Sequence, residues 1–485
     1  MTGRAVALRA VAVGASALLV LFLLRPGVGE IVEAARPSMT LSVAVTGNDE
    51  GYLEPCGCAG GLLGGLPRRH TLLQAVKGGG EKTLLPLSNG GIVKLAGEFY
   101  DGKRHEGGPL DVVKLETFLL AMDRMGYAAL NLAPNELALG RSALIPALEL
   151  VEIPLLATNL VDEGEPPLPV RRWTARDTPW GRVLVLGLMA LSGQQQLGAI
   201  DEALHLEDPA EAAKGALREA GEAHFVVALL RGDRRSAEQL AAAVAAIDVI
   251  FISGGSEIPE SFPRGSTGNP SGAASEAPGS VPAMIATTGA KGKFIPIVTF
   301  EEREPRAKAS FQMLSVSEDL PDSPDMRDYF ALHLERLAAE NVLAAYLEKE
   351  EVPGGLHYVG ASACAECHGA ESEAWERSEH FRSWATLAKV GRTADPDCVQ
   401  CHVTGFGLKS GFASLEKTPS LSIVSCEECH GAGSKHVESV REEGESRFAG
   451  PHERGRSACP ACHDMDHSPA FNFEKYWQKI AHGKE

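Results

Sequence analysis

Four copies of the pattern Cys-x-x-Cys-His lie in the last part of this 485-residue chain. Two thiols one short turn apart can form thioethers with both vinyl groups of one haem, and the histidine that follows can bind the iron. Each copy therefore predicts a covalent c-type haem site, so the predicted cofactor is four c-type haems. The predicted thioether residues are Cys364 and Cys367, Cys398 and Cys401, Cys426 and Cys429, and Cys459 and Cys462, and the predicted proximal ligands are His368, His402, His430 and His463.

Two other interpretations of these cysteines have to be weighed. Cys-x-x-Cys pairs also build zinc ribbons, and cysteines of secreted proteins usually form disulfides. A zinc ribbon has no need of a histidine after every pair, and a disulfide framework needs no histidine at all. Because the four copies use eight of the ten cysteines and each ends in histidine, haem attachment is favoured over both.

The sixth ligand of each iron decides what each haem can do. Two histidines give a low-spin electron carrier, whereas an open position admits a small ligand. The candidate distal ligands are His380, His436 and His482, followed by His357. The first three histidines leave one of the four irons without an assigned distal ligand.

The preceding residues, 39–305, have a different pattern. Apolar strand-like runs alternate with helical periodicity, which predicts an α/β layered domain. Residues 264–282 are rich in Gly, Ser and Pro and predict a surface loop. The expected strands are Leu41–Val45, Tyr127–Leu132, Ile153–Ala157, Val183–Leu188, Phe225–Leu230 and Val249–Ile252, and the expected helices are Leu110–Met125, Pro209–Ala220 and Ser236–Ala246.

This domain also carries strings that occur at metal loops of a known family. Thr46–Pro55, Asn131–Gly140 and Ile252–Glu257 resemble, in order and in part of their residues, loops of the calcineurin-like metallophosphatases of the secreted 5′-nucleotidase type. The resemblance implies a metallophosphatase-like fold. In that family, two metal ions held by Asp, His and Asn side chains activate water for attack on phosphorus.

Several of the metal ligands that the resemblance implies are missing here. Asp49 is kept, but Gly51 stands where a histidine is expected and Asn89 stands where a carboxylate is expected. Asn135-Glu136 lacks the second histidine, and both histidines are absent from 254–257. Too few ligands remain for two metals, so a non-catalytic phosphatase-like module is predicted.

The two remaining cysteines, Cys56 and Cys58, lie in a glycine-rich part of the first of these loops. Three interpretations stay open: a soft-metal site, a redox-active thiol pair, and a structural pair. Cys-x-Cys is short for an unstrained disulfide, so an internal bridge would be labile.

An apolar helical repeat in 322–351 predicts a helical linker over residues 306–354, which Pro353-Gly-Gly355 ends. Residues 355–485 form the last predicted domain. Beyond the four motifs, five of its strings resemble the tetrahaem cytochromes of the c-554 type found in nitrifying bacteria. These strings are Tyr358–Cys364, Trp375–His380, Cys401–Gly407, Val424–His436 and Phe471–His482.

The resemblance implies a mainly α, loop-rich multihaem cytochrome c domain in which the macrocycles form the core. It favours His380, His436 and His482 as distal ligands, and it implies one five-coordinate haem. An apo form of such a domain is not expected to fold.

The first 38 residues begin with Arg4 and Arg9, followed by an apolar run over 10–24. This pattern predicts a signal peptide or an uncleaved N-terminal membrane anchor. The expected location is the periplasm or the outer face of the cytoplasmic membrane of a bacterium. The formal net charge of −18 argues against nucleic acid as a partner.

The leading prediction is an exported multihaem cytochrome that transfers electrons between a redox donor and a redox acceptor protein. The alternative is an oxidoreductase that acts on a small nitrogen compound at an open haem. A metallophosphatase or 5′-nucleotidase is the third hypothesis, and the sequence gives no oligomeric state.

Overall fold

The computed structural model describes residues 40–55, 61–78, 82–96, 99–100, 103–104, 107–262, 283–301, 309–444 and 457–482. The predicted signal peptide or anchor, the pair Cys56 and Cys58, and the predicted loop over 264–282 lie outside the described residues.

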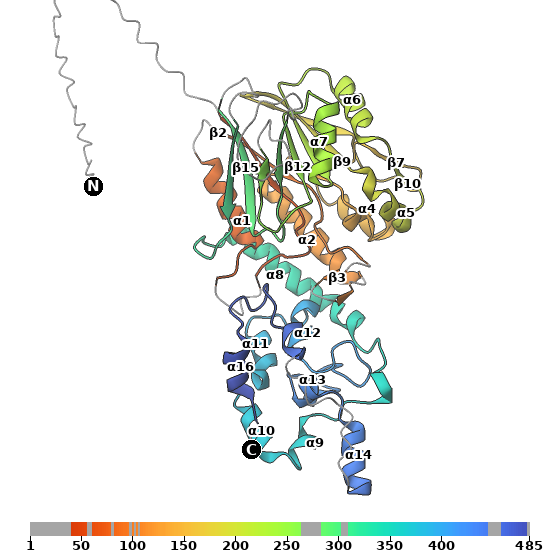
Figure 1. Cartoon of the computed structure of the whole chain (residues 1–485), viewed down its shortest axis with the longest axis vertical. Coiled ribbons are helices and arrows are strands. Elements are labelled where there is room, and N and C mark those ends of the chain that lie inside the picture. Colours follow the sequence, from red (N-terminus) through yellow and green to blue (C-terminus); the bar gives the residue numbers. More distant parts are fainter. Residues whose placement is uncertain are drawn as a thin grey trace, which may run out of the picture. The chain divides into compact units, whose positions relative to one another are not determined.

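Two six-stranded sheets form the centre of the N-terminal domain (Figure 1). The first has the order β16-β15-β1-β2-β5-β6 and the second the order β13-β14-β12-β11-β9-β8. The first consists of β1 (Thr40–Thr46), β2 (Lys82–Ser88), β5 (Ala129–Asn131) and β6 (Leu155–Leu156), all parallel, with β15 (Phe294–Phe300) antiparallel to β1 and β16 (Ala309–Ser315) antiparallel to β15. The second consists of β9 (Gly181–Met189), β11 (Phe225–Arg231), β12 (Val249–Ile252) and β14 (Met284–Thr287), all parallel, with β8 (Trp173–Thr178) and β13 (Ser261–Phe262) antiparallel at the edges.

Two short ribbons and a set of helices complete the domain. The ribbons pair β7 (Leu160–Asp162) with β10 (Leu204–Leu206) and β3 (Phe99–Tyr100) with β4 (Lys103–Arg104). The helices are α1 (Leu66–Lys77), α2 (Pro109–Met125), α3 (Pro134–Leu137), α4 (Arg141–Leu148), η1 (Leu191–Gly193), α5 (Gln194–Ile200), α6 (Pro209–Ala220) and α7 (Arg234–Ala243).

The buried side chains divide the domain into four layers. Leu41 and Val43 on β1 face the second sheet, while Ala44 faces the helices, as the two-residue period of a strand requires. Between the sheets, Phe225 packs against Trp180 and Phe300 with ring centroids 5.7 and 4.3 Å away. Side chains of α1, α2 and α4 cover the first sheet, and those of α6 and α7 cover the second. The predicted α/β layered domain is confirmed.

All the strands and helices expected in this domain are present, with bounds that differ by a few residues. Sequence analysis did not identify β2 and β15, which lie on either side of β1 in the first sheet. Each contains a proline, Pro86 or Pro296, and proline predicts against a central strand because it cannot donate a ladder hydrogen bond.

The predicted linker, 306–354, is divided between the two domains. Its first described element is the strand β16, which pairs with β15 and extends the first sheet beyond the expected boundary at residue 305. α8 (Pro324–Ala339) then packs on α1 and α2. Asn341, with φ of 49°, bends the chain into η2 (Val342–Tyr346), and η3 (Pro353–Gly355) follows. Backbone bonds from Lys349 and Glu350 to the Gly407 carbonyl join the end of the segment to the C-terminal domain.

The C-terminal domain consists of short helices and loops, as predicted. They are α9 (Ala361–Ala365), α10 (Gly369–Glu376), η4 (Glu379–Arg382), α11 (Ser383–Lys389), α12 (Pro396–His402), η5 (Pro419–Leu421), α13 (Cys426–His430), α14 (Ser434–Glu443), η6 (Cys459–Ala461) and α16 (Phe473–Ile480). The largest apolar cluster of its described part has only Leu387, Val399, Val403, Phe412 and Leu421 as buried members. Across the described ranges of the chain, we find no helix that is long and apolar enough to cross a membrane.

Candidate haem-binding site

Short helical turns carry the four Cys-x-x-Cys-His motifs. The second and third motifs lie within α12 and α13, the first begins in α9, and the fourth begins in η6. In the first motif the His368 amide donates to the Cys364 carbonyl at 2.9 Å, and in the fourth the His463 amide donates to the Cys459 carbonyl at 2.9 Å. One helical turn therefore holds both thiols and the histidine of a motif together.

Three of the four proximal candidates face a second histidine from another element. His368 lies opposite His436 of α14, with ring centroids 6.3 Å apart. His463 lies opposite His380 of η4 at 6.3 Å, and His430 lies opposite His482, which follows α16, at 6.0 Å. Each pair therefore joins a motif histidine to one of the three preferred distal candidates.

These separations can be compared with the geometry of an iron between two imidazoles. Two metal–nitrogen bonds of about 2 Å each, in line through the metal, place the two ring centres roughly 6 Å apart. The three histidine pairs have this spacing. The residues present therefore fit haem iron held by two histidines at the first, third and fourth motifs.

The remaining two histidines of interest behave differently. His357, the fourth distal candidate, is exposed, and the structure does not bring it opposite a motif histidine within the described residues. None of the described histidines forms a ring pair with His402 either. The His402 Nδ1 lies 2.7 Å from the Ser383 carbonyl and donates to it, which leaves Nε2 as the nitrogen able to bind iron.

Burial keeps several of these imidazoles in the form that binds metal. It lowers the pKa of His380, His402 and His463 below the ordinary value of 6.5. Only a neutral imidazole has a lone pair for a metal. The His463 Nδ1 also lies 2.9 Å from the Ser468 hydroxyl, so a hydrogen bond fixes the orientation of this ring.

Glu427, one of the variable residues of the third motif, has a structural role that sequence analysis missed. Its buried carboxylate accepts hydrogen bonds from the amides of Val359, Gly360 and Gly433, with the shortest at 2.8 Å. It thereby ties the third motif to the segment that leads into the first. No sequence signal marks it, because a glutamate between two cysteines is as easily explained by solvent exposure.

The N-terminal domain has a polar cavity of about 520 Å³ at the carboxyl ends of its parallel strands. Asn48, Glu50, Asn135, Arg231 and Glu257 are among the residues that line it. It contains residues of all three strings that resemble phosphatase metal loops. The structure therefore brings these strings together, as their resemblance implies.

Arginine side chains bind the polar groups that remain around this cavity. Arg69 forms a fully buried ion pair with Asp49, the one kept acidic ligand. Arg231 donates to the Asn48 side chain at 2.7 Å and to the Asn135 side chain at 3.4 Å. The carboxylate that a metal would need is therefore already neutralised by a guanidinium.

Other polar residues at the same place serve the backbone. Asn131 donates to the Asn89 side chain at 2.9 Å, and Asn89 donates to the carbonyls of Leu230 and Phe251. Glu136 accepts from the Ile92 and Ala133 amides. Within the described ranges, no group of three or more His, Cys, Asp or Glu residues could hold a metal ion.

Comparison with known proteins supports the interpretation of the C-terminal domain. Residues 363–431 match the family model described as cytochrome c554 and c-prime. This range includes the first three motifs. The chain is also 35% identical over 91 residues to cytochrome c-554 of Nitrosomonas europaea, a match that covers 16% of this chain and 39% of that protein.

Solved structures similar to the chain include the 5′-nucleotidase precursor from Thermus thermophilus. Its TM-score is 0.49 at 18% identity, and the match covers 67% of this chain and 63% of that one. Another is the calcineurin-like phosphoesterase YfkN from Bacillus subtilis, with a TM-score of 0.47 at 14% identity over 62% of this chain and 98% of that one. Joined to the α/β domain, residues 363–431 of this chain are thus similar to the cytochrome c554 family.

Proposed function

We propose that this protein is an exported c-type cytochrome that carries electrons through four covalently bound haems. The observation that carries the proposal is the set of three histidine pairs with ring centroids 6.0–6.3 Å apart. A haem iron between two imidazoles supplies one-electron transfer and has no site open to substrate. The family match to residues 363–431 supports the same role.

Each residue then has a defined part. The thiols of a motif would attach one haem, and the motif histidine would be one ligand of its iron. His436, His482 and His380 would be the second histidine ligands at the first, third and fourth motifs respectively. In a domain with so small an apolar core, these bonds also hold helices that are distant in sequence, such as η4 and η6, to one another.

The N-terminal domain is proposed to be a non-catalytic scaffold on which the haem domain is mounted. Arg69 holds Asp49, and Arg231 occupies the side chains of Asn48 and Asn135. A phosphatase of the resembled family would need such groups for two metals. Phosphate-ester hydrolysis is the outcome that would contradict this part of the proposal, tested on several nucleotides with added Mn²⁺ or Zn²⁺.

Export to the periplasm, or tethering to the outer face of the membrane, is proposed from the basic and apolar pattern of the first 38 residues. Redox proteins are the proposed donor and acceptor. Fractionation of cells that produce the full chain tests the location: haem-stained protein is expected in the periplasm or on the membrane, and cytoplasmic apoprotein would contradict it.

Electron paramagnetic resonance of the oxidised, haem-loaded protein tests the electron-transfer role. We expect low-spin signals for the haems of the first, third and fourth motifs. His380→Ala, His436→Ala and His482→Ala should each turn one low-spin haem high-spin, whereas the matched control His357→Ala should leave the spectrum unchanged. A variant that changes nothing would remove its histidine from the set of ligands.

A second candidate function rests on His402. In the described part of the chain His402 has no ring pair of the kind found at the other three motifs, and the resemblance to c-554-type cytochromes implies one five-coordinate haem, so the haem of the second motif is proposed to have an open position. Reaction of a small nitrogen compound at this iron would make the protein an oxidoreductase. A high-spin signal that changes with nitric oxide would favour this candidate, with hydroxylamine and nitrite as the substrates to try. Low-spin signals from all four haems, unaffected by the gas, would exclude it.

A further inference from the structure

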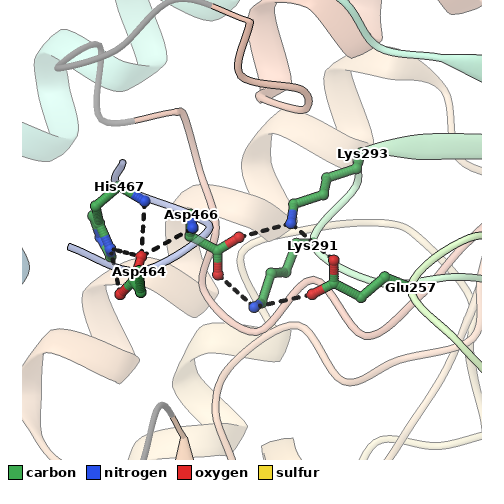
Figure 2. A network of polar contacts seen from close by, with 6 residues as sticks. All are labelled: Glu257, Lys291, Lys293, Asp464, Asp466 and His467. Carbon is green, nitrogen blue, oxygen red and sulfur yellow. Dashed lines mark hydrogen bonds and ion pairs between the residues drawn. The ribbon is translucent and has the colours of Figure 1, made fainter. Parts of the chain in front are cut away.

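A closed network of four charges joins the fourth haem motif to the N-terminal domain (Figure 2). Asp466, three residues after His463, accepts from Lys291 Nζ at 2.5 Å and from Lys293 Nζ at 2.7 Å. The same two ammonium groups contact Glu257 at 3.2 and 2.9 Å. Both lysines come from the turn between β14 and β15, so the network links two domains.

Three of the four side chains are largely withdrawn from water. Those of Lys291 and Lys293 are 16% and 13% exposed and that of Asp466 is 9% exposed, whereas the Glu257 side chain, on the outer side of the lysines, is 48% exposed. Ion pairs in such surroundings are screened less than surface pairs. Burial would raise the pKa of Asp466, but hydrogen bonds from both lysines outweigh it, and the pKa lies below its ordinary value. The network therefore contains two positive and two negative charges near neutral pH.

Asp466 belongs to a turn that holds the proximal histidine of the fourth motif. The Asp464 carboxylate accepts from the amides of Asp466 and His467 at 2.9 and 2.8 Å and from the His467 ring at 2.7 Å (Figure 2). At the end of the turn, the Ser468 hydroxyl bonds to the His463 ring. A displacement of Asp466 would therefore reach the His463 ring through the hydrogen bonds of this short turn.

Other contacts between the domains do not involve these lysines. The ammonium of Lys114 on α2 pairs with Asp397 of α12, and Arg392 pairs with Glu54 at 2.6 Å. These contacts lie at the second motif. Because they remain when Lys291 and Lys293 are changed, the domains are expected to stay docked in such variants.

We propose that Lys291 and Lys293 are positioning residues for the fourth haem, which orient His463 through Asp466 and set the reduction potential of that haem by their charge. This inference rests on the proposed function, since it requires a haem at the fourth motif. It gives the phosphatase-like domain an electrostatic role in addition to that of a scaffold.

The sign of the effect follows from charge. Oxidised haem carries one more positive charge than reduced haem, so positive groups nearby favour the reduced form. Lys291→Gln with Lys293→Gln leaves two carboxylates and should lower the potential of this haem. Asp466→Asn leaves two lysines against one carboxylate and should raise it. A loosened turn alone would move both variants in the same direction.

The test is a spectroelectrochemical titration of the full haem-loaded protein. The haem that turns high-spin in His380→Ala identifies the fourth haem. We expect about a tenfold change in its ratio of oxidised to reduced form at fixed potential, equivalent to about 59 mV for one electron, downward in the double lysine variant and upward in Asp466→Asn. The matched control Lys409→Gln removes an exposed lysine that pairs with Glu351 and should shift nothing.

Each result decides the proposal. Opposite shifts confined to the fourth haem support it. Unchanged potentials, or shifts of one sign in both variants, overturn it while leaving the four-haem cytochrome intact. A wild-type protein with no haem at the fourth motif, measured by mass spectrometry of haem peptides, would overturn the proposed function and this inference together.

Discussion

The two domains differ in what fills their interiors. The N-terminal domain buries three apolar clusters around two sheets, including Trp180, Phe225 and Phe300 between them. The described part of the C-terminal domain has one small cluster of buried apolar residues, and three pairs of its histidines lie with ring centroids 6.0–6.3 Å apart. The first domain is thus held together by apolar side-chain packing, of which the second has little.

The same difference extends to the polar groups. In the N-terminal domain, the Asp49 carboxylate is neutralised by Arg69, and Arg231 binds the neighbouring side chains of Asn48 and Asn135. In the C-terminal domain, burial lowers the pKa of His380, His402 and His463 and leaves neutral rings able to bind metal. We therefore expect the chemistry in the C-terminal domain, which has a small apolar core. The N-terminal domain, which has a large apolar core, is expected to act as a scaffold.

Removal of the haems should have the largest effect, because it should unfold the C-terminal domain and leave the N-terminal domain folded. In full-length chain produced without haem attachment, amides of the two sheets should remain protected from hydrogen exchange, while those of 356–482 should exchange like an unfolded peptide. The haem-loaded chain is the control. Strong protection of α12 and α13 in the apoprotein would show that the small apolar cluster suffices for folding.

Phe225→Ala tests the opposite domain. It removes a fully buried ring that contacts both Trp180 and Phe300, and it should lower the free energy of unfolding of the N-terminal domain by about 3–5 kcal/mol. Denaturant unfolding followed by circular dichroism gives this value, while the haem absorbance of the folded protein should not change. Leu150→Ala, at a half-exposed position, is the control and should cost under about 0.5 kcal/mol.

Glu427→Ala tests whether buried hydrogen bonds stabilise the C-terminal domain, in which apolar packing is scarce. It leaves three backbone amides without their carboxylate partner and should lower the stability of the haem-loaded domain by about 3 kcal/mol. Chemical unfolding followed by the Soret band measures this. The exposed Glu373→Ala serves as the control, and equal stability of the two variants would show that Glu427 contributes little.

We expect a smaller effect on stability from the protonation of His333, which lies where α8 packs on α2. Burial lowers the pKa of this histidine from 6.5 to about 3; Lys114 and Arg392 act in the same direction and Asp397 opposes them. The unfolded chain binds this proton below pH 6.5 and the folded chain does not, so stability present above that pH is lost as the pH falls towards 3.

For His333 we expect a loss of about 2 kcal/mol between pH 7 and pH 5 from this residue alone. The difference between wild type and His333→Gln in denaturant unfolding at the two pH values isolates it. If the variant loses as much stability as the wild type, the assignment to His333 is wrong.

Much of this architecture followed from local sequence pattern. The strands β1, β9, β11 and β12 are apolar runs, and α2 and α6 have helical periodicity, so the regular elements of the α/β domain were predictable. The strands β2 and β15 were not predicted, because each contains a proline. Their place beside β1 depends on pairing between strands that are distant in sequence. The end of the first sheet was placed too early for the same reason, since β16 is identified by its partner β15.

For the candidate site, the sequence by itself determined the four motifs, because haem attachment depends on the spacing of a few consecutive residues. It also determined the three histidines that now face a motif partner. Only the tertiary structure decided which pairs form, since His368 and His436, or His380 and His463, meet through folding of the whole domain. The same holds for Arg69 on Asp49 and for Lys291 and Lys293 on Asp466: a charged residue has no recognisable signal in sequence until folding places its partner beside it.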